Sequence, residues 1–148
     1  KLLATVYTDA LHLAAGAEYV WNYNLDTRLP LPLTPPFSAF VEVEYSWQNL
    51  WKALEELSVG ARAAQFAAQN RIDRGEFVTP GYFLADLQVQ ANWKFGQQPL
   101  TLRLAVQNLT GTRYMNHLSR YRLLNLPEQG RNFTASVQIP LVVSQKKR

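Results

Sequence analysis

The fold is decided by the stretch Phe83-Leu84-Ala85-Asp86-Leu87-Gln88-Val89-Gln90-Ala91-Asn92-Trp93-Lys94-Phe95. Every odd position is apolar, and every even position after Leu84 is polar. Successive side chains of a β-strand point to opposite faces of the sheet, so this alternation predicts a strand with one apolar and one polar face. A helix would instead repeat its apolar positions every ~3.6 residues.

The same alternation recurs along the chain. Clear runs occupy residues 11–25, 37–47, 100–106 and 133–141, with a weaker, alanine-rich run at 57–69 and a short run at 2–7. The connections are expected to alternate between long and short: a proline-rich loop at 26–36, a turn at 48–56, a loop at 70–81, a tight turn at 96–99 and a long excursion at 108–132. The sequence therefore predicts an all-β chain of six or seven antiparallel strands.

Composition excludes several classes of protein. The chain has 148 residues, 47% of them hydrophobic and 18% charged, which is typical of a folded protein rather than a disordered one. It contains no cysteine, so a disulfide framework or a cysteine-ligated metal is excluded. The net charge of +4 is scattered instead of forming a basic stripe, and nucleic-acid binding is not expected.

Aromatic residues stand at both ends of the apolar faces. Phe37 and Trp47 stand at the two ends of one apolar face, and Phe83 and Trp93 stand at the two ends of another. At ~3.3 Å per residue and a tilt of ~40°, this separation spans about 25 Å, the height of the apolar band on a transmembrane β-barrel. The opposite faces carry charges of both signs, as in a polar lumen: Glu42, Glu44, Asp86, Lys94 and Arg103.

Short motifs stand where loops meet strands. Residues 106–120 contain Val-Gln-Asn-Leu, then a tyrosine and His-Leu-Ser, and residues 130–132 read Gly-Arg-Asn. Paired prolines precede the run at 37–47, and Thr-Pro-Gly-Tyr at 79–82 precedes the run at 83–95. In this order the motifs resemble the C-terminal barrel region of TonB-dependent outer-membrane receptors. The motif positions are Pro35, Pro36, Gly81, Tyr82, Asn108, Leu109, Tyr114, His117, Leu118, Gly130, Arg131 and Asn132.

This resemblance implies that residues 1–141 are the C-terminal part of an antiparallel transmembrane β-barrel of about 22 strands, followed by a basic tail at 142–148. It implies a receptor in the outer membrane of a Gram-negative-type bacterium, with the C-terminus on the periplasmic side. The expected partners are outer-membrane lipid, a small-molecule or metal-complex ligand such as a ferric siderophore or haem, and the TonB system acting through a plug domain. The terminal aromatic residue common in the family is replaced here by residues 142–148.

Several motif positions have a physical reason. Gly81 and Gly130 stand where loops re-enter strands, a place that often requires a positive φ. Asn108 can bond neighbouring backbone where strand pairing ends. Arg131 and Asn132 open a strand beneath a long loop, and we expect them to bond the carbonyl groups of that loop.

The search for chemistry gives few candidates. His117 lies near Met115, and imidazole and thioether are both metal ligands, but a role in loop packing is favoured over a metal site. His117, Arg120 and Tyr121 are therefore weak candidates for ligand contact. No nucleophile elbow, phosphate-binding loop or dinucleotide fingerprint is present, so neither a catalytic residue nor a cofactor is predicted.

Two alternatives remain open at this point. One is a small self-contained outer-membrane barrel of about eight strands with a structural or adhesive role. The other is a soluble lipid-binding β-barrel whose apolar faces turn inward.

Overall fold

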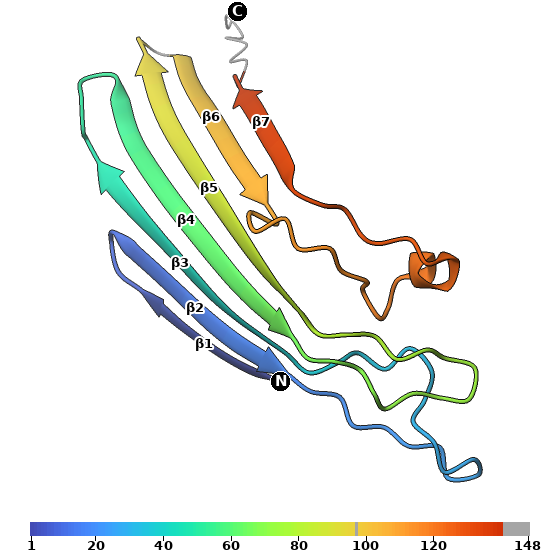
Figure 1. Ribbon diagram of the computed structural model, residues 1–148. Coiled ribbons are helices and arrows are strands. Elements are labelled where there is room, and N and C mark those ends of the chain that lie inside the picture. Colours follow the sequence, from blue (N-terminus) through green and yellow to red (C-terminus); the bar gives the residue numbers. More distant parts are fainter. Residues whose placement is uncertain (97, 141–148) are drawn as a thin grey trace, which may run out of the picture.

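The computed structural model describes residues 1–96 and 98–140. Its strands form one antiparallel sheet (Figure 1). Seven strands lie side by side in chain order, so each strand pairs with its sequence neighbour. They are β1 (Leu2–Tyr7), β2 (Leu11–Glu18), β3 (Ser38–Gln48), β4 (Leu54–Phe66), β5 (Tyr82–Phe95), β6 (Gln98–Gln107) and β7 (Asn132–Gln138). The predicted all-β, antiparallel fold is confirmed.

Helical structure in the described residues is limited to one short 3₁₀ helix, η1 (Arg120–Leu124). Ser119 caps it by accepting a hydrogen bond from the Tyr121 N–H, and Asn125 ends it in the left-handed conformation. Across residues 1–96 and 98–140, no helix has both the length and the apolarity needed to cross a membrane.

Strand bounds differ from the predicted runs mainly beside the loops. β2 ends at Glu18, although the alternation continues to Leu25. Beyond Glu18 the asparagines bond the loop: Asn22 accepts from Leu31 N–H, and Asn24 accepts from Asp26 N–H. These side chains replace the neighbouring strand as partners for the backbone, so strand pairing stops.

Three other strands are shifted. β4 is displaced toward the N-terminus from the predicted 57–69, and β6 starts at Gln98 instead of residue 100. β7 ends at Gln138; Leu141, the last residue of the predicted run, and the predicted tail 142–148 lie outside the described residues.

The apolar faces of the strands form one continuous surface. Val59, Val89 and Leu104 are register partners across β4, β5 and β6, and rows above and below repeat this pattern. A soluble sandwich would bury such a surface, yet large residues on it, including Leu87 and Leu104, are exposed. Within the described residues, the buried hydrophobic residues are only Leu54, Ala64, Tyr82 and Ala91. This surface has the character of a lipid-contacting face.

The opposite face is polar and bonded across the strands. Gln88 donates to Glu44 at 2.9 Å, and Arg103 donates to Gln90 at 2.6 Å. Asn92 accepts from Thr101 at 2.9 Å. Each bond joins side chains of different strands, so this face is suited to the polar interior of a barrel.

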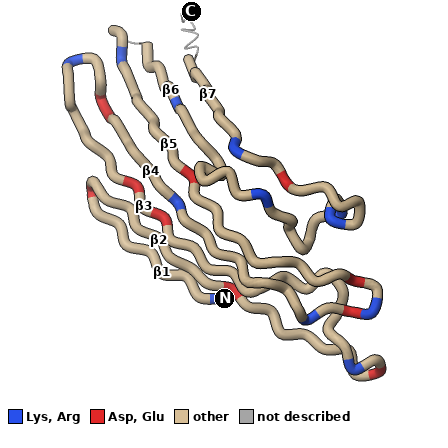
Figure 2. The backbone as a smooth tube through the Cα atoms, in the orientation of Figure 1, with Lys and Arg blue, Asp and Glu red and all other residues tan. Residues whose placement is uncertain are grey.

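The three long connections leave the sheet at one end, and the short ones lie at the other (Figure 1). The long loops are residues 19–37, 67–81 and 108–131. Charged residues occur both along the strands and in the long loops (Figure 2). The predicted order of long and short connections is confirmed, and it brings three loops together that are distant in sequence.

The two faces can be tested with neighbouring residues of β5. We expect Val89→Arg to lower the free energy of unfolding of the full-length barrel by about 2–4 kcal/mol, because a charge then faces lipid. Gln88→Arg should cost much less, since its side chain lies on the polar face beside Glu44. Urea unfolding in liposomes measures both.

Val89→Trp separates a lipid-facing site from a packed interior. Overpacking a core costs about 1–3 kcal/mol, whereas fluid lipid chains accommodate the ring. Strong destabilisation by the tryptophan would contradict the lipid-facing assignment.

Candidate functional site

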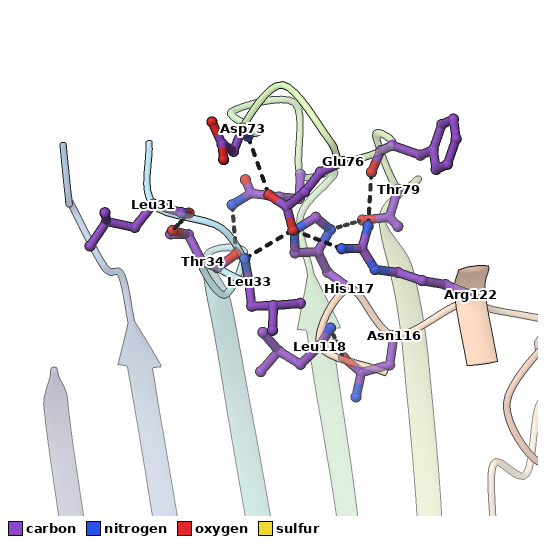
Figure 3. A network of polar contacts seen from close by, with 12 residues as sticks. Leu31, Leu33, Thr34, Asp73, Glu76, Thr79, Asn116, His117, Leu118 and Arg122 are labelled. Carbon is purple, nitrogen blue, oxygen red and sulfur yellow. Dashed lines mark hydrogen bonds and ion pairs between the residues drawn. The ribbon is translucent and has the colours of Figure 1, made fainter. Parts of the chain in front are cut away.

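A buried carboxylate joins the three long loops (Figure 3). Glu76 Oε1 accepts the Leu33 N–H at 2.9 Å and an Arg122 Nη2–H at 2.8 Å, and Oε2 accepts the Asp73 N–H at 3.2 Å. Leu33, Glu76 and Arg122 belong to loops 19–37, 67–81 and 108–131 respectively. The side chain of Glu76 is only 8% exposed. We name the side chains of Glu76, Thr79, His117 and Arg122, with the Leu33 N–H, the loop cluster.

His117 packs into the loop cluster with 1% of its surface exposed. Its Nδ1 lies 3.0 Å from Thr79 Oγ1, and its Nε2 lies 3.7 Å from Glu76 Oε1. Burial lowers the pKa of His117 and the charge of Arg122 lowers it further, against the opposing effect of Glu76. His117 Nδ1 and the Thr79 hydroxyl share a hydrogen bond, while Nε2 is buried facing Glu76 without a hydrogen-bond partner among the described residues.

Arg122 and Glu76 form the ion pair of the loop cluster. Arg122 is buried, and its Nη1 donates to Phe77 O at 3.1 Å while Nη2 donates to the carboxylate. Burial raises the pKa of Glu76, but the Leu33 and Asp73 N–H groups, then Arg122 and His117, outweigh it, so the pKa lies below its ordinary value. The pair therefore stays charged at neutral pH.

Hydrogen bonds between uncharged groups also connect the loops near the ion pair. Gln69 is buried and donates to Thr34 O at 2.8 Å, which links loop 67–81 to loop 19–37. Thr34 in turn bonds Asn22 within its own loop. Gln69 and Thr79 pair through their backbones, at 2.9 and 3.2 Å, and this bridge holds Thr79 where His117 meets it.

The predicted ligand candidates do not form one set. His117 lies inside the loop cluster, whereas Arg120 and Tyr121 are exposed at the start of η1, Tyr121 by 61%. Contact with an external ligand is thus open to Arg120 and Tyr121 in this conformation, while His117 contacts protein.

Asn108 organises the start of loop 108–131. It is buried with φ 49°, and its side chain accepts from Thr112 N–H at 2.9 Å and donates to Thr112 O at 2.8 Å. Its backbone N–H donates to Asp86 Oδ1 at 2.8 Å. The next motif residue, Leu109, is exposed.

An aromatic stack supports the loop bases. The ring centroid of Tyr82 lies 4.3 Å from that of Tyr114 and 4.5 Å from that of Phe66. The three rings come from β5, loop 108–131 and the end of β4. Of the other motif residues, Leu118 is exposed and Pro35 and Pro36 are half-buried.

The expectation of a positive φ at Gly81 and Gly130 is wrong. Among described residues, the glycines with positive φ are Gly96 and Gly111. Gly81 is required by close approach instead, because a Cβ there would lie 2.8 Å from Phe66 O. A Cβ at Gly130 would meet no atom within 4 Å, and nothing in the structure explains this glycine.

Asn132 also differs from its expected role. Its side chain donates to Gln107 Oε1 at 3.2 Å rather than to a loop carbonyl, because the two residues are register partners of β7 and β6. Arg131 lies beside Gly111, where a Cβ would be 3.3 Å from its Nη2.

A polar hollow of about 260 Å³ lies on the polar face. Its walls include Glu42, Arg62, Asp86, Gln88 and Gln107. Arg62 is register partner of both Glu42 and Asp86 and lies over the Phe40 ring, 4.9 Å from its centroid. Within the described residues, no group of three or more His, Cys, Asp or Glu side chains could hold a metal ion.

Sequence analysis did not single out Glu76, Gln69 or Thr34 for this site. Glu76 and Thr34 lie in loops without periodicity, and Gln69 was assigned to the end of the predicted strand at 57–69, so no pattern marks any of them as a site residue. Arg122 follows two of the ligand candidates but had no predicted contact. The one usable signal was His117, whose predicted loop-packing role agrees with its position in the loop cluster.

The loop cluster should loosen as the pH falls. Glu76 and His117 both have a pKa below their ordinary values of 4.5 and 6.5, so the opened state binds more protons than the closed state. We expect the protection factors of residues 116–124, which compare the exchange rate of unstructured peptide with that of the folded chain at the same pH, to fall as the pH drops below 6.5, and again below 4.5.

Removing the carboxylate should have the same effect at neutral pH. Glu76→Gln leaves Arg122 buried without its counter-charge, a change that typically costs about 3–5 kcal/mol. Glu55→Gln is the matched control, since it breaks an exposed 3.5 Å pair with Lys94 worth about 0–1 kcal/mol. Equal protection of 116–124 in the two variants would contradict the role of the ion pair.

Comparison with known proteins identifies the family. The chain matches the family described as "TonB dependent receptor-like, beta-barrel" over residues 2–109. Among solved structures, "Copper transporter OprC" matches with a TM-score of 0.69 and 24% identity, covering 89% of this chain and 21% of that chain. At this identity the likeness supports the fold alone, and no curated protein sequence matches. The chain belongs to the TonB-dependent receptor β-barrel family.

Proposed function

We propose that this chain forms part of the barrel of an outer-membrane receptor that captures a scarce nutrient for TonB-driven uptake. The single observation that carries the proposal is the loop cluster, which holds three long loops as one unit at the end of a polar barrel interior. Loops fixed in this way present a preorganised surface to a ligand. Family membership supports an outer-membrane location.

The orientation follows from loop lengths. In outer-membrane barrels the extracellular loops are long and the periplasmic turns short. The lengths of loops 19–37, 67–81 and 108–131 support the proposal that these loops lie outside the cell and that the C-terminus lies on the periplasmic side.

For the ligand we propose a metal complex, such as a ferric siderophore or haem. The name of the matching copper transporter supports a metal-containing substrate in general, without choosing among complexes. Arg120 and Tyr121 are the proposed contacts, since both are exposed on η1. The chain spans 21% of that transporter's length, and contacts from the rest of the full-length protein, including a plug through which TonB acts, belong to the same proposal.

The two alternatives have less support. A soluble lipid-binding barrel requires inward apolar faces, whereas the apolar face here is exposed. A small structural or adhesive barrel is not the usual role of the matched family. The family also consists of receptors and transporters, which is consistent with a function other than catalysis.

Uptake tests the proposal directly. The full-length protein, expressed in a strain lacking its own receptors, should import a labelled metal complex only when TonB is present. Arg120→Ala with Tyr121→Ala should weaken ligand binding to intact cells, whereas Glu55→Gln at the opposite end of the sheet should not. Uptake that is equal with and without TonB would refute the mechanism.

Proteolysis of intact cells tests the orientation. Trypsin should cut after the exposed Arg120 and spare Arg122, which is buried in the loop cluster. Lys94, beside the short turn, should be cut only after the cells are broken. Cleavage at Lys94 in intact cells would show that the orientation is inverted.

A further inference from the structure

A cation and an aromatic pair stand where loop 19–37 leaves the sheet. The guanidinium carbon of Arg71 lies 3.6 Å from the centroid of the Trp21 ring. Its Nη1 donates to Tyr19 Oη at 3.2 Å, and its Nη2 donates to Asn22 O at 3.3 Å. The group is outside the loop cluster and joins loop 67–81 to loop 19–37.

Tyr19 and Trp21 extend the apolar face beyond the end of β2. Ala17 pairs with Ala39 on that face, in the row that reaches Phe83 on β5. Past Ala17 the alternation of exposure continues: Tyr19 is 51% and Trp21 is 68% exposed. Asn22 lies on the inner side, where it bonds Thr34.

This position corresponds to the membrane–water boundary. Phe83 belongs to the aromatic girdle at the loop end of the lipid-facing surface. Ala17 lies in the same cross-strand row as Phe83, and Tyr19 lies two residues beyond Ala17, toward the loops. Tyrosine and tryptophan prefer this level because an apolar ring and a polar tip are satisfied together. A guanidinium stacked on the outer ring therefore lies at the depth of lipid headgroups.

We propose that Arg71, held by Trp21 and Tyr19, binds the phosphate of a lipid in the outer leaflet. The inference rests on the loop orientation given under the proposed function. Guanidinium has five N–H donors in a planar fork that matches phosphate, and only two nitrogens are engaged by protein. The Trp21 ring fixes the plane of the fork, which lowers the entropy lost on binding.

The surrounding charges favour an anion. Across residues 1–96 and 98–140, Arg71 forms no ion pair, and Glu76 of the same loop is paired with Arg122. Arg74 adds a second exposed positive charge to the same loop, against Asp73. A lipid phosphate supplies the counter-ion that the protein leaves out, and its acyl chains continue along the apolar face.

Native mass spectrometry of the full-length protein in detergent tests the proposal. The probe is lipid A, a phosphorylated glycolipid, with the same glycolipid after phosphatase treatment as the matched control. Wild type should prefer the phosphorylated form, and Arg71→Gln should reduce that preference about fivefold, the effect of one basic residue at an anionic surface. Arg74→Gln, in the same loop without an aromatic partner, should retain most of it.

Two further arms keep the outcome decisive. Arg71→Lys retains the charge but not the planar fork, so it should bind between wild type and Arg71→Gln; equal binding by all three would overturn the proposal. Displacement of lipid A by millimolar inorganic phosphate would show a free-phosphate site instead. Lipid binding is measured here without transport. The lipid-binding result can therefore be interpreted even if TonB-driven uptake fails, and the uptake result can be interpreted even if lipid binding fails.

Discussion

The antiparallel backbone ladder is the constraint on which the rest of the structure depends. In a membrane no water satisfies backbone N–H and C=O groups, so each strand must bond both neighbours along its length. Within the described sheet, β2 to β6 each pair with both sequence neighbours, and the edge strands β1 and β7 each pair with one. The ladder fixes the register, and the register sends Val89 to the apolar face and Gln88 to the polar face. One slip of a residue would exchange the two faces of a strand.

The ladder also explains why the loops meet. An up-and-down order places every second connection at the same end of the sheet, so loops 19–37, 67–81 and 108–131 emerge as neighbours. Polar groups of the loops need hydrogen-bond partners, and the Glu76 carboxylate accepts three hydrogen bonds. Two come from the backbone N–H groups of Leu33 and Asp73, and one comes from the Arg122 side chain. Arg122 balances its charge, and His117 fills the remaining space as a neutral ring. The cost of desolvating the ion pair is offset by these added hydrogen bonds.

The same geometry separates two surfaces of the loops. Arg120 and Tyr121 are exposed on η1, and the polar hollow lined by residues of β3 to β6 lies on the polar face of the sheet. Trp21 is exposed beyond the end of β2 and carries the stacked guanidinium of Arg71. The loop cluster shares loop 67–81 with Arg71 and loop 108–131 with Arg120 and Tyr121.

The strands, their two faces, the alternation of loop lengths and the family resemblance could all be predicted from the amino-acid sequence. These features follow from a period of two and from short local motifs, which need no knowledge of distant partners. The meeting of Leu33, Glu76 and Arg122 is visible only in the folded chain. Glu76 lies 43 residues from Leu33 and 46 residues from Arg122, and polar loops carry no periodicity. The structure also shows that Gly81 is needed because backbone packs closely against it, and not because its φ is positive. A backbone conformation and a steric contact select the same small residue, so sequence alone cannot separate them.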